Sequence, residues 1–212
     1  MRENFNRLIE RVEKAAILSG RILKDIQIIA VTKNASIQQM EEAYDLSLRL
    51  FGENRLQKAL LKMPLFPKDV KWHFIGPIQS NKAIEIARYF SVIHSVSSLK
   101  LAQIFSSEGL KQQKKISCFF QVNCSGEAQK QGFTLEEFLL LEKELLALKG
   151  LEVQGLMTMA PRTLDQDKIR QCFRSLKNIS RYPFLSMGMS EDFELAIEEG
   201  ATHIRMGSAL FS

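Results

Sequence analysis

The sequence predicts an α/β fold, a (β/α)8 barrel with an extra helix at its amino terminus. Three observations carry this prediction: short apolar segments alternate with helical repeats, eight such segments are present, and a helical pattern precedes the first. Parallel strands need long crossover connections, which the intervening helices supply. A doubly wound sheet is the alternative. It normally has a glycine-rich turn after its first strand, and residues 31–36, VTKNAS, contain no glycine.

The elements follow in order along the chain. A helix is expected over residues 3–19, because Phe5, Leu8 and Val12 fall on one face of it. Helical repeats fill most of the intervals between the strands. We expect helix 3–19 to take the place of the helix missing after the last strand, because the sequence stops at Ser212. The eight predicted strands are residues 26–31, 48–52, 71–76, 91–96, 116–123, 152–158, 184–188 and 202–207.

Composition indicates one globular domain, residues 1–212, because no linker-like tract or internal repeat divides the chain. The 45% apolar residues are enough for a core. No apolar run is long enough to cross a membrane, and the first residues do not form a secretory signal. Three cysteines without CxxC spacing suit reduced thiols. We therefore expect a cytoplasmic protein that does not associate with membranes.

Charge and histidine placement exclude two kinds of partner. The net charge is +5, and the one dense basic segment, residues 111–115, is typical of a solvated turn rather than a nucleic-acid surface. An anionic small molecule suits this mild excess equally well. His73, His94 and His203 are scattered without metal-ligand spacing. We therefore expect neither a nucleic-acid partner nor a metal site.

Lys33 closely follows the first predicted strand, whose apolar residues indicate burial. Barrels of this type place functional groups at the carboxyl ends of their strands. A lysine buried there would have a lowered pKa and a nucleophilic amine, which suits a Schiff base with an aldehyde or ketone. The alternative is a lysine whose amine simply reaches solvent. The strand alone leaves both interpretations open.

The last two strands end in loops that suit an anion. Gly188 and Ser190 follow one strand, and Gly207 and Ser208 follow the other. In such barrels these two loops commonly bind phosphate, because glycines let the ligand approach backbone N–H groups closely. The glycines also suit ordinary turns. A ligand with an aldehyde at one end and a phosphate at the other, such as pyridoxal 5′-phosphate (PLP), would satisfy both predicted sites. Arg205 would then face the ring nitrogen, or else serve as an ion-pair residue of the barrel interior.

Seven segments in order resemble the YggS/PROSC family of pyridoxal phosphate homeostasis proteins over nearly the whole chain. The segments are AVTK, FGEN, WHFIGPIQSNK, HSVSSLKLA, QVNCSGEAQKQGF, GLMTMAP and LSMGMSEDFELAIEEGATHIRMGSALF. The resemblance implies a barrel similar to the amino-terminal domain of alanine racemase, with Lys33 as the lysine that forms the Schiff base with PLP. It also implies that Ser190, Gly207 and Ser208 line the phosphate pocket and that Arg205 meets the pyridine nitrogen.

Other positions carry less defined implications. Asn54 in FGEN suits a cofactor contact or an N-cap of the following helix equally well. Lys130 matches a family lysine, although a surface role is the simpler interpretation. The family often has a second lysine and a proline after its Schiff-base lysine, where this chain has residues 34–36, NAS. It also usually has threonine at the position of Ser208, a change that keeps the hydroxyl.

Three function hypotheses follow. The first is a monomeric carrier that holds PLP for intracellular homeostasis and delivers it, with PLP-dependent apo-enzymes as candidate partners and without substantial catalysis. The second is a PLP-dependent amino-acid racemase or related enzyme, and the third is a nucleic-acid binder. Racemisation needs a base on each face of the substrate carbon, and Tyr44, Tyr89 and Tyr182 all fall in or beside predicted helices. The carrier is therefore favoured.

Overall fold

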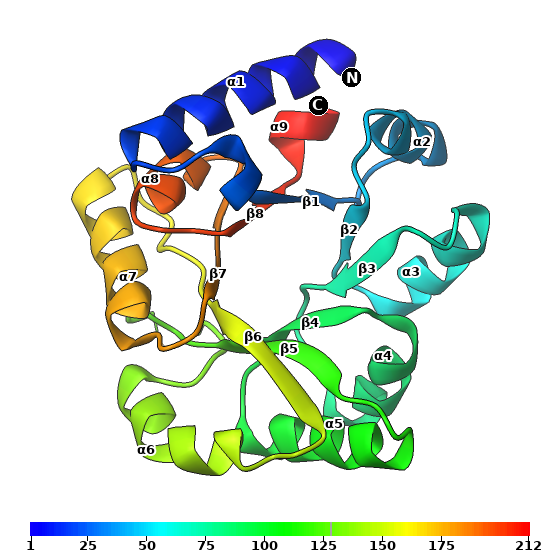
Figure 1. The fold of residues 1–212 in the computed structure, drawn as a ribbon, viewed down its shortest axis with the longest axis vertical. Helices are drawn as coiled ribbons and strands as arrows, with labels where there is room; N and C mark the ends of the chain where they lie inside the picture. Colours follow the sequence, from blue (N-terminus) through cyan, green and yellow to red (C-terminus); the bar gives the residue numbers. More distant parts are fainter. Residues whose placement is uncertain (128) are drawn as a thin grey trace.

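Eight parallel strands close into a barrel in the order of the sequence (Figure 1). The computed structural model describes residues 1–127 and 129–212. The first and last strands also pair with each other, and this pairing closes the barrel. The strands are β1 (Gln27–Val31), β2 (Leu50–Glu53), β3 (Lys71–Phe74), β4 (Val92–Val96), β5 (Ile116–Gln121), β6 (Leu151–Met157), β7 (Phe184–Met189) and β8 (His203–Met206). The (β/α)8 prediction is confirmed, and the doubly wound alternative is wrong.

Helices connect successive strands and cover the outside of the barrel (Figure 1). They are α2 (Ile37–Asp45), α3 (Leu56–Lys62), α4 (Ala83–Tyr89), α5 (Leu99–Lys111), α6 (Leu135–Leu146), α7 (Gln166–Ile179) and α8 (Phe193–Glu198), with one-turn 3-10 helices at Leu23–Asp25, Met63–Leu65 and Ser80–Lys82. Two helix starts are fixed by capping boxes, Ser36 with Gln39 and Thr134 with Glu137. In the part of the chain that the structure describes, no helix is both long and apolar enough for a membrane span.

The extra helix α1 (Arg2–Leu18) lies beside α8 and against the short helix α9 (Ser208–Phe211), as Figure 1 shows. Leu8 and Val12 are buried on its inner face. Arg21, just after α1, donates to the backbone carbonyl of Ala201 at 2.8 Å and to that of Ile197. The predicted place of the extra helix is confirmed. The expectation that no helix follows the last strand is wrong, because α9 makes one turn there.

The buried side chains form two regions of different character. Between strands and helices the core is apolar, as where Phe51, Phe66 and Trp72 pack edge to face with ring centroids 5.4–6.2 Å apart. Inside the barrel, polar groups from four strands are buried and contact one another: His73, His94, Ser186 and Arg205. Barrel interiors are usually filled by branched apolar residues. The polar interior of this barrel therefore needs a further explanation.

Candidate cofactor site

Lys33 lies at the carboxyl end of β1, as expected, but its side chain is exposed. The strand ends at Val31, and the chain enters a turn at Lys33, two residues further on. Of the two interpretations that the strand left open, this exposure agrees with a lysine whose amine reaches solvent. The apolar run of β1 predicts burial only for the residues of the strand itself. The residues that follow must turn outwards to reach α2. The amine is free to meet a ligand at the mouth of the barrel.

The loops after β7 and β8 are held together by one hydroxyl. Ser190 Oγ accepts hydrogen bonds from the backbone N–H of Gly207 at 3.3 Å and from that of Ala209 at 3.2 Å. Gly207 is beside β1, since a Cβ built on it would lie 3.9 Å from the Cβ of Val31. Ser208, the first residue of α9, is exposed. The three residues predicted to line a phosphate pocket are thus brought together at the mouth, next to the strand that precedes Lys33.

The conformation of the β7 loop depends on Gly188 and Asp192. Gly188 has φ +94°, a region that favours glycine, and a Cβ on it would lie 2.6 Å from the Cβ of Ala196. Asp192 Oδ1 accepts the N–H of Met189 at 2.6 Å, and burial raises the pKa of this carboxyl. Any larger residue at 188 would push the loop away from α8. The position of Ser190 therefore depends on the local fold as well as on its own bonds.

Arg205 projects from β8 into the barrel, where it is buried. Its Nη1 donates to the carbonyl and to the Oγ of Ser186, both at 2.8 Å, and its Nη2 donates to the carbonyl of Thr158 at 2.9 Å. Burial lowers the pKa of Arg205 to about 10, and the Asp192 carboxylate partly opposes this. A guanidinium has five N–H donors. In the described chain these bonds use three of them, so one on Nη2 and the one on Nε remain for a ligand.

Asn54 follows β2 directly and is half-buried. The N-cap interpretation is wrong: α3 begins at Leu56, and its N-cap is Arg55, which makes no side-chain capping bond. The backbone of Asn54 passes close to Gly76, where an added Cβ would lie 2.3 Å from the Asn54 carbonyl oxygen. A cofactor contact by Asn54 stays a prediction.

Sequence reasoning missed an ion pair beside Lys33. Glu53, at the end of β2, is fully buried and lies 2.6 Å from Lys62 Nζ of α3. Thr32 joins both: its Oγ1 donates to Glu53 Oε1 at 2.7 Å, and its carbonyl accepts from Lys62 Nζ at 2.6 Å. The residue before Lys33 is therefore tied to α3 and β2. A buried acid at the end of a strand, with a lysine nine residues later, was the available signal.

Sequence reasoning also missed the buried histidines on β3 and β4. His73 Nδ1 is 2.8 Å from His94 Nε2, and His94 Nδ1 is 2.9 Å from Ser186 Oγ. The ring of His94 stacks on Phe119, with centroids 4.4 Å apart. Burial lowers the pKa of His73 to about 3 and that of His94 well below its usual value. Each histidine is alone in its strand, so no spacing pattern in the sequence indicates that the two meet.

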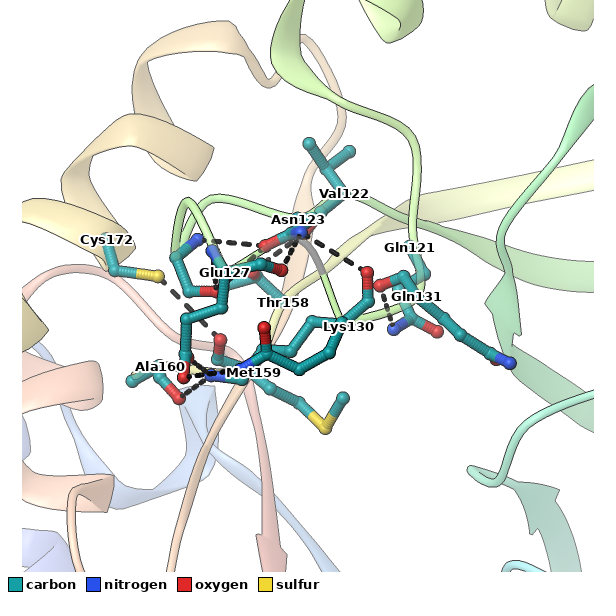
Figure 2. A network of polar contacts seen from close by, with 12 residues as sticks. Gln121, Val122, Asn123, Glu127, Lys130, Gln131, Thr158, Met159, Ala160 and Cys172 are labelled. Carbon is teal, nitrogen blue, oxygen red and sulfur yellow. Dashed lines mark hydrogen bonds and ion pairs between the residues drawn. The ribbon is translucent and has the colours of Figure 1, made fainter. Parts of the chain in front are cut away.

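Lys130 is half-buried at the same end of the barrel, within a network of polar contacts that links two loops (Figure 2). Its Nζ donates to the carbonyl of Ala160 at 2.7 Å and forms an ion pair with Glu127. Asn123 Nδ2 donates to the carbonyl of Glu127 at 2.9 Å and to that of Lys130 at 3.3 Å. The simpler interpretation of Lys130 as a surface lysine is wrong. It joins the loop after β5 to the loop after β6.

Comparison with known proteins agrees with this geometry. Residues 3–212 match the family model "Alanine racemase, N-terminal domain". Two relatives named pyridoxal phosphate homeostasis protein come from Pseudomonas aeruginosa, 39% identical over 99% of this chain and 94% of the relative, and from Aquifex aeolicus, 35% identical over 99% and 96%.

Solved structures show the same fold. PipY of Synechococcus elongatus, solved with PLP bound, is 32% identical with a TM-score of 0.83, covering 95% of this chain and all of its own. Alanine racemase of Clostridium difficile has a TM-score of 0.76 at 13% identity, over 99% of this chain and 55% of the racemase, so it shows the fold alone. The chain therefore belongs to the alanine racemase N-terminal domain family and, within it, to the pyridoxal phosphate homeostasis proteins.

Proposed function

We propose that the protein holds PLP reversibly through Lys33 and serves PLP homeostasis and delivery without substantial catalysis. One observation carries the proposal: three neighbouring strands, β7, β8 and β1, present a Ser–Gly loop pair, a buried guanidinium and an amine at one end of the barrel. These groups match the phosphate, the ring nitrogen and the aldehyde of PLP. The names of the relatives and the PLP bound to PipY support the same assignment.

Each residue would have one task. Lys33 would hold PLP through a carbon–nitrogen double bond between its amine and the aldehyde carbon, with loss of water. Arg205 directs its remaining N–H donors at the ring nitrogen, while Ser190, Gly207 and Ser208 hold the phosphate. When bound, PLP supplies a reactive aldehyde and a ring that withdraws electrons.

Arg205 also supports the proposal that turnover is negligible. An arginine can only donate hydrogen bonds, so the ring nitrogen must accept and stay unprotonated, which makes it a weak electron sink. A racemase compensates with a second base opposite the lysine. The three tyrosines of this chain are not placed for that task. Tyr44 lies in α2, Tyr89 lies in α4, and Tyr182 precedes β7 at the opposite end from the candidate site.

The remaining parts of the proposal concern setting and partners. We propose a cytoplasmic monomer that passes PLP to PLP-dependent apo-enzymes. Cys118, Cys124 and Cys172 are all free thiols, which supports a reducing compartment. Size-exclusion chromatography with light scattering checks the monomer, and transfer of PLP to an apo-aminotransferase checks delivery.

Borohydride reduction tests the proposal directly. Protein incubated with PLP and then reduced should carry one pyridoxyl group, located on Lys33 by peptide mass mapping. Lys33→Ala should lose both this label and the visible absorption of the adduct, because the nucleophile is gone.

Lys130→Ala is the matched control, because Lys130 is a half-buried lysine at the same mouth and should leave the label on Lys33. A label found only on Lys130, or none at all, contradicts the proposal.

The non-catalytic part is tested with L-alanine in deuterated water. Optical inversion at an enzymatic rate of about 1 per second or faster, lost in Lys33→Ala, would make the protein a racemase instead.

A further inference from the structure

Four polar groups form an unbroken chain through the barrel interior. His73 of β3 contacts His94 of β4, His94 contacts Ser186 of β7, and Ser186 accepts from Arg205 of β8, with successive distances of 2.8, 2.9 and 2.8 Å. Strands β4 and β7 are not neighbours, so the His94–Ser186 bond must cross the interior. Figure 1 shows β3 and β4 on one side of the barrel and β7 and β8 on the other. The chain therefore connects the far wall of the barrel to Arg205.

Arg205 sets the direction of the first bond in this chain, because a guanidinium can only donate, and this favours one direction for the other two. Ser186 Oγ accepts from Arg205 and can turn its own proton towards His94 Nδ1. His94 then carries its proton on Nε2 and donates to His73 Nδ1, so His73 is also protonated on Nε2. This arrangement leaves one group without a partner among the described residues, the Nε2–H of His73.

The opposite direction is less favourable. If His94 donated from Nδ1, Ser186 Oγ would accept two bonds, and its own proton would have no acceptor in the described part of the chain. The lone pair of His73 Nε2 would lack a partner as well. Each buried polar group without a partner costs about 1–3 kcal/mol. The arrangement with a single unpartnered group is therefore preferred.

Stability of the barrel alone does not account for this chain. Apolar side chains of similar size could fill the same space, and replacing buried polar groups in this way is often neutral or stabilising. The chain does stabilise a charge: with this direction, each member turns its electron-rich side towards the guanidinium. That arrangement opposes the loss of solvation that Arg205 suffers on burial.

We propose that His94 and His73 are positioning residues, which act through Ser186 to fix the Arg205 guanidinium as an oriented donor towards the ligand ring. The inference rests on the proposed function in that Arg205 meets the ring nitrogen of PLP. With Nη1 held by Ser186 and Nη2 held by the carbonyl of Thr158, two of the three guanidinium nitrogens are fixed, and this also fixes the position of the free N–H groups on Nη2 and Nε. Loss of His94 would release the Ser186 hydroxyl and loosen that orientation.

The first test uses the apo-protein, so it does not depend on PLP. Nitrogen-15 NMR of the imidazole rings at pH 7 should show both His73 and His94 protonated on Nε2. Exchange of the Arg205 guanidinium protons should be slow in the wild type and about tenfold faster in His94→Leu, which removes the acceptor of the Ser186 proton. His94→Asn should restore slow exchange, because the Asn oxygen takes the place of Nδ1.

The second test uses PLP labelled with nitrogen-15 in its ring. His94→Leu should shift the ring-nitrogen signal and weaken PLP binding about tenfold, which is about 1.4 kcal/mol, and His94→Asn should recover most of both. His203→Asn is the control: His203 lies in the same interior, 6.2 Å from His94 between ring centroids, but its Nδ1 bonds Thr202 at 2.9 Å and stays outside the chain.

The outcomes separate the two ideas. Protonation of His94 on Nδ1, or unchanged guanidinium exchange in His94→Leu, overturns the positioning chain whether or not PLP binds. The positioning chain is also overturned if His94→Leu binds PLP as tightly as the wild type and shows the same ring-nitrogen signal. If the wild type binds no PLP, the proposed function fails, and the apo-protein measurements still decide the chain.

Discussion

At the mouth of the barrel, the hydroxyl of Ser190 has two tasks that compete for the same atom. It accepts the N–H groups of Gly207 and Ala209, which joins the loops after β7 and β8, and it is also a predicted ligand of the phosphate. Ser208 differs, because it is exposed and its hydroxyl makes no side-chain hydrogen bond within the described residues. The two serines therefore allow loop structure and ligand contact to be separated.

Ser190→Ala should lower both stability and PLP affinity. Two half-buried N–H groups lose their acceptor, so we expect the free energy of unfolding to fall by roughly 1–2 kcal/mol and binding to weaken by roughly 1–3 kcal/mol. Ser208→Ala should change stability by less than about 0.5 kcal/mol, because it removes an exposed group, while weakening PLP binding. Urea unfolding and PLP titration measure the two effects. Equal affinity for pyridoxal and PLP in the wild type would show that these loops do not bind the phosphate.

At the scale of elements, the pair of Glu53 and Lys62 attaches α3 to the ends of β1 and β2. Lys62 Nζ reaches Glu53 and the carbonyl of Thr32, both at 2.6 Å, so one amine joins a helix to two strands. Removing one partner of a buried ion pair leaves an uncompensated charge, which is much worse than removing both. This contact lies next to Lys33, so the position of the predicted nucleophile depends on it.

Lys62→Met should therefore lower the free energy of unfolding by about 3 kcal/mol, because the Glu53 carboxylate stays buried without its cation. The double variant Glu53→Leu/Lys62→Met should recover most of this loss, since no buried charge remains. Urea unfolding of the two single variants and the double variant measures the coupling. Additive losses in the double variant would show that the pair does not act as a unit.

The order of strands and helices could be predicted from the sequence because it depends on local patterns. All eight strands and the extra helix appear where the apolar periodicity placed them. Details that depend on where the chain turns could not: the strand pattern did not decide whether Lys33 is buried, and it did not show that α3 begins after Arg55 rather than after Asn54. The Ser190 bridge between two loops also needed coordinates, although the two loops themselves were predicted. Hydrogen bonds between distant loops leave no periodic signal.

Over the whole molecule, the barrel has an apolar outer core and an interior that is polar but carries few charges. His94 bonds Ser186, 92 positions further along the chain, and His73 bonds His94, 21 positions away. A single histidine in a strand does not reveal its partner across a barrel, which is why the sequence indicated only scattered histidines. Their burial in the neutral form gives the whole molecule a specific response to acid.

The apo-protein should lose stability steadily as the pH falls below about 6.5, the ordinary pKa of histidine. Burial lowers the pKa of His73 to about 3 and that of His94 well below its usual value, so both stay neutral in the folded state while the unfolded chain takes up protons. Stability is therefore present above pH 6.5 and is lost on acidification. Between pH 6 and pH 5 the two residues should lower the free energy of unfolding by about 2 kcal/mol. His203, whose pKa is lowered to about 4 by burial, adds to the loss in the same direction. Above pH 5 most carboxylates remain ionised, which keeps their contribution small.

Urea unfolding at pH 7, 6 and 5 measures the loss, and His73→Asn should reduce it by about 1 kcal/mol, because one titrating group is gone. A pH dependence that is the same in His73→Asn as in the wild type would show that this histidine is not held neutral in the fold.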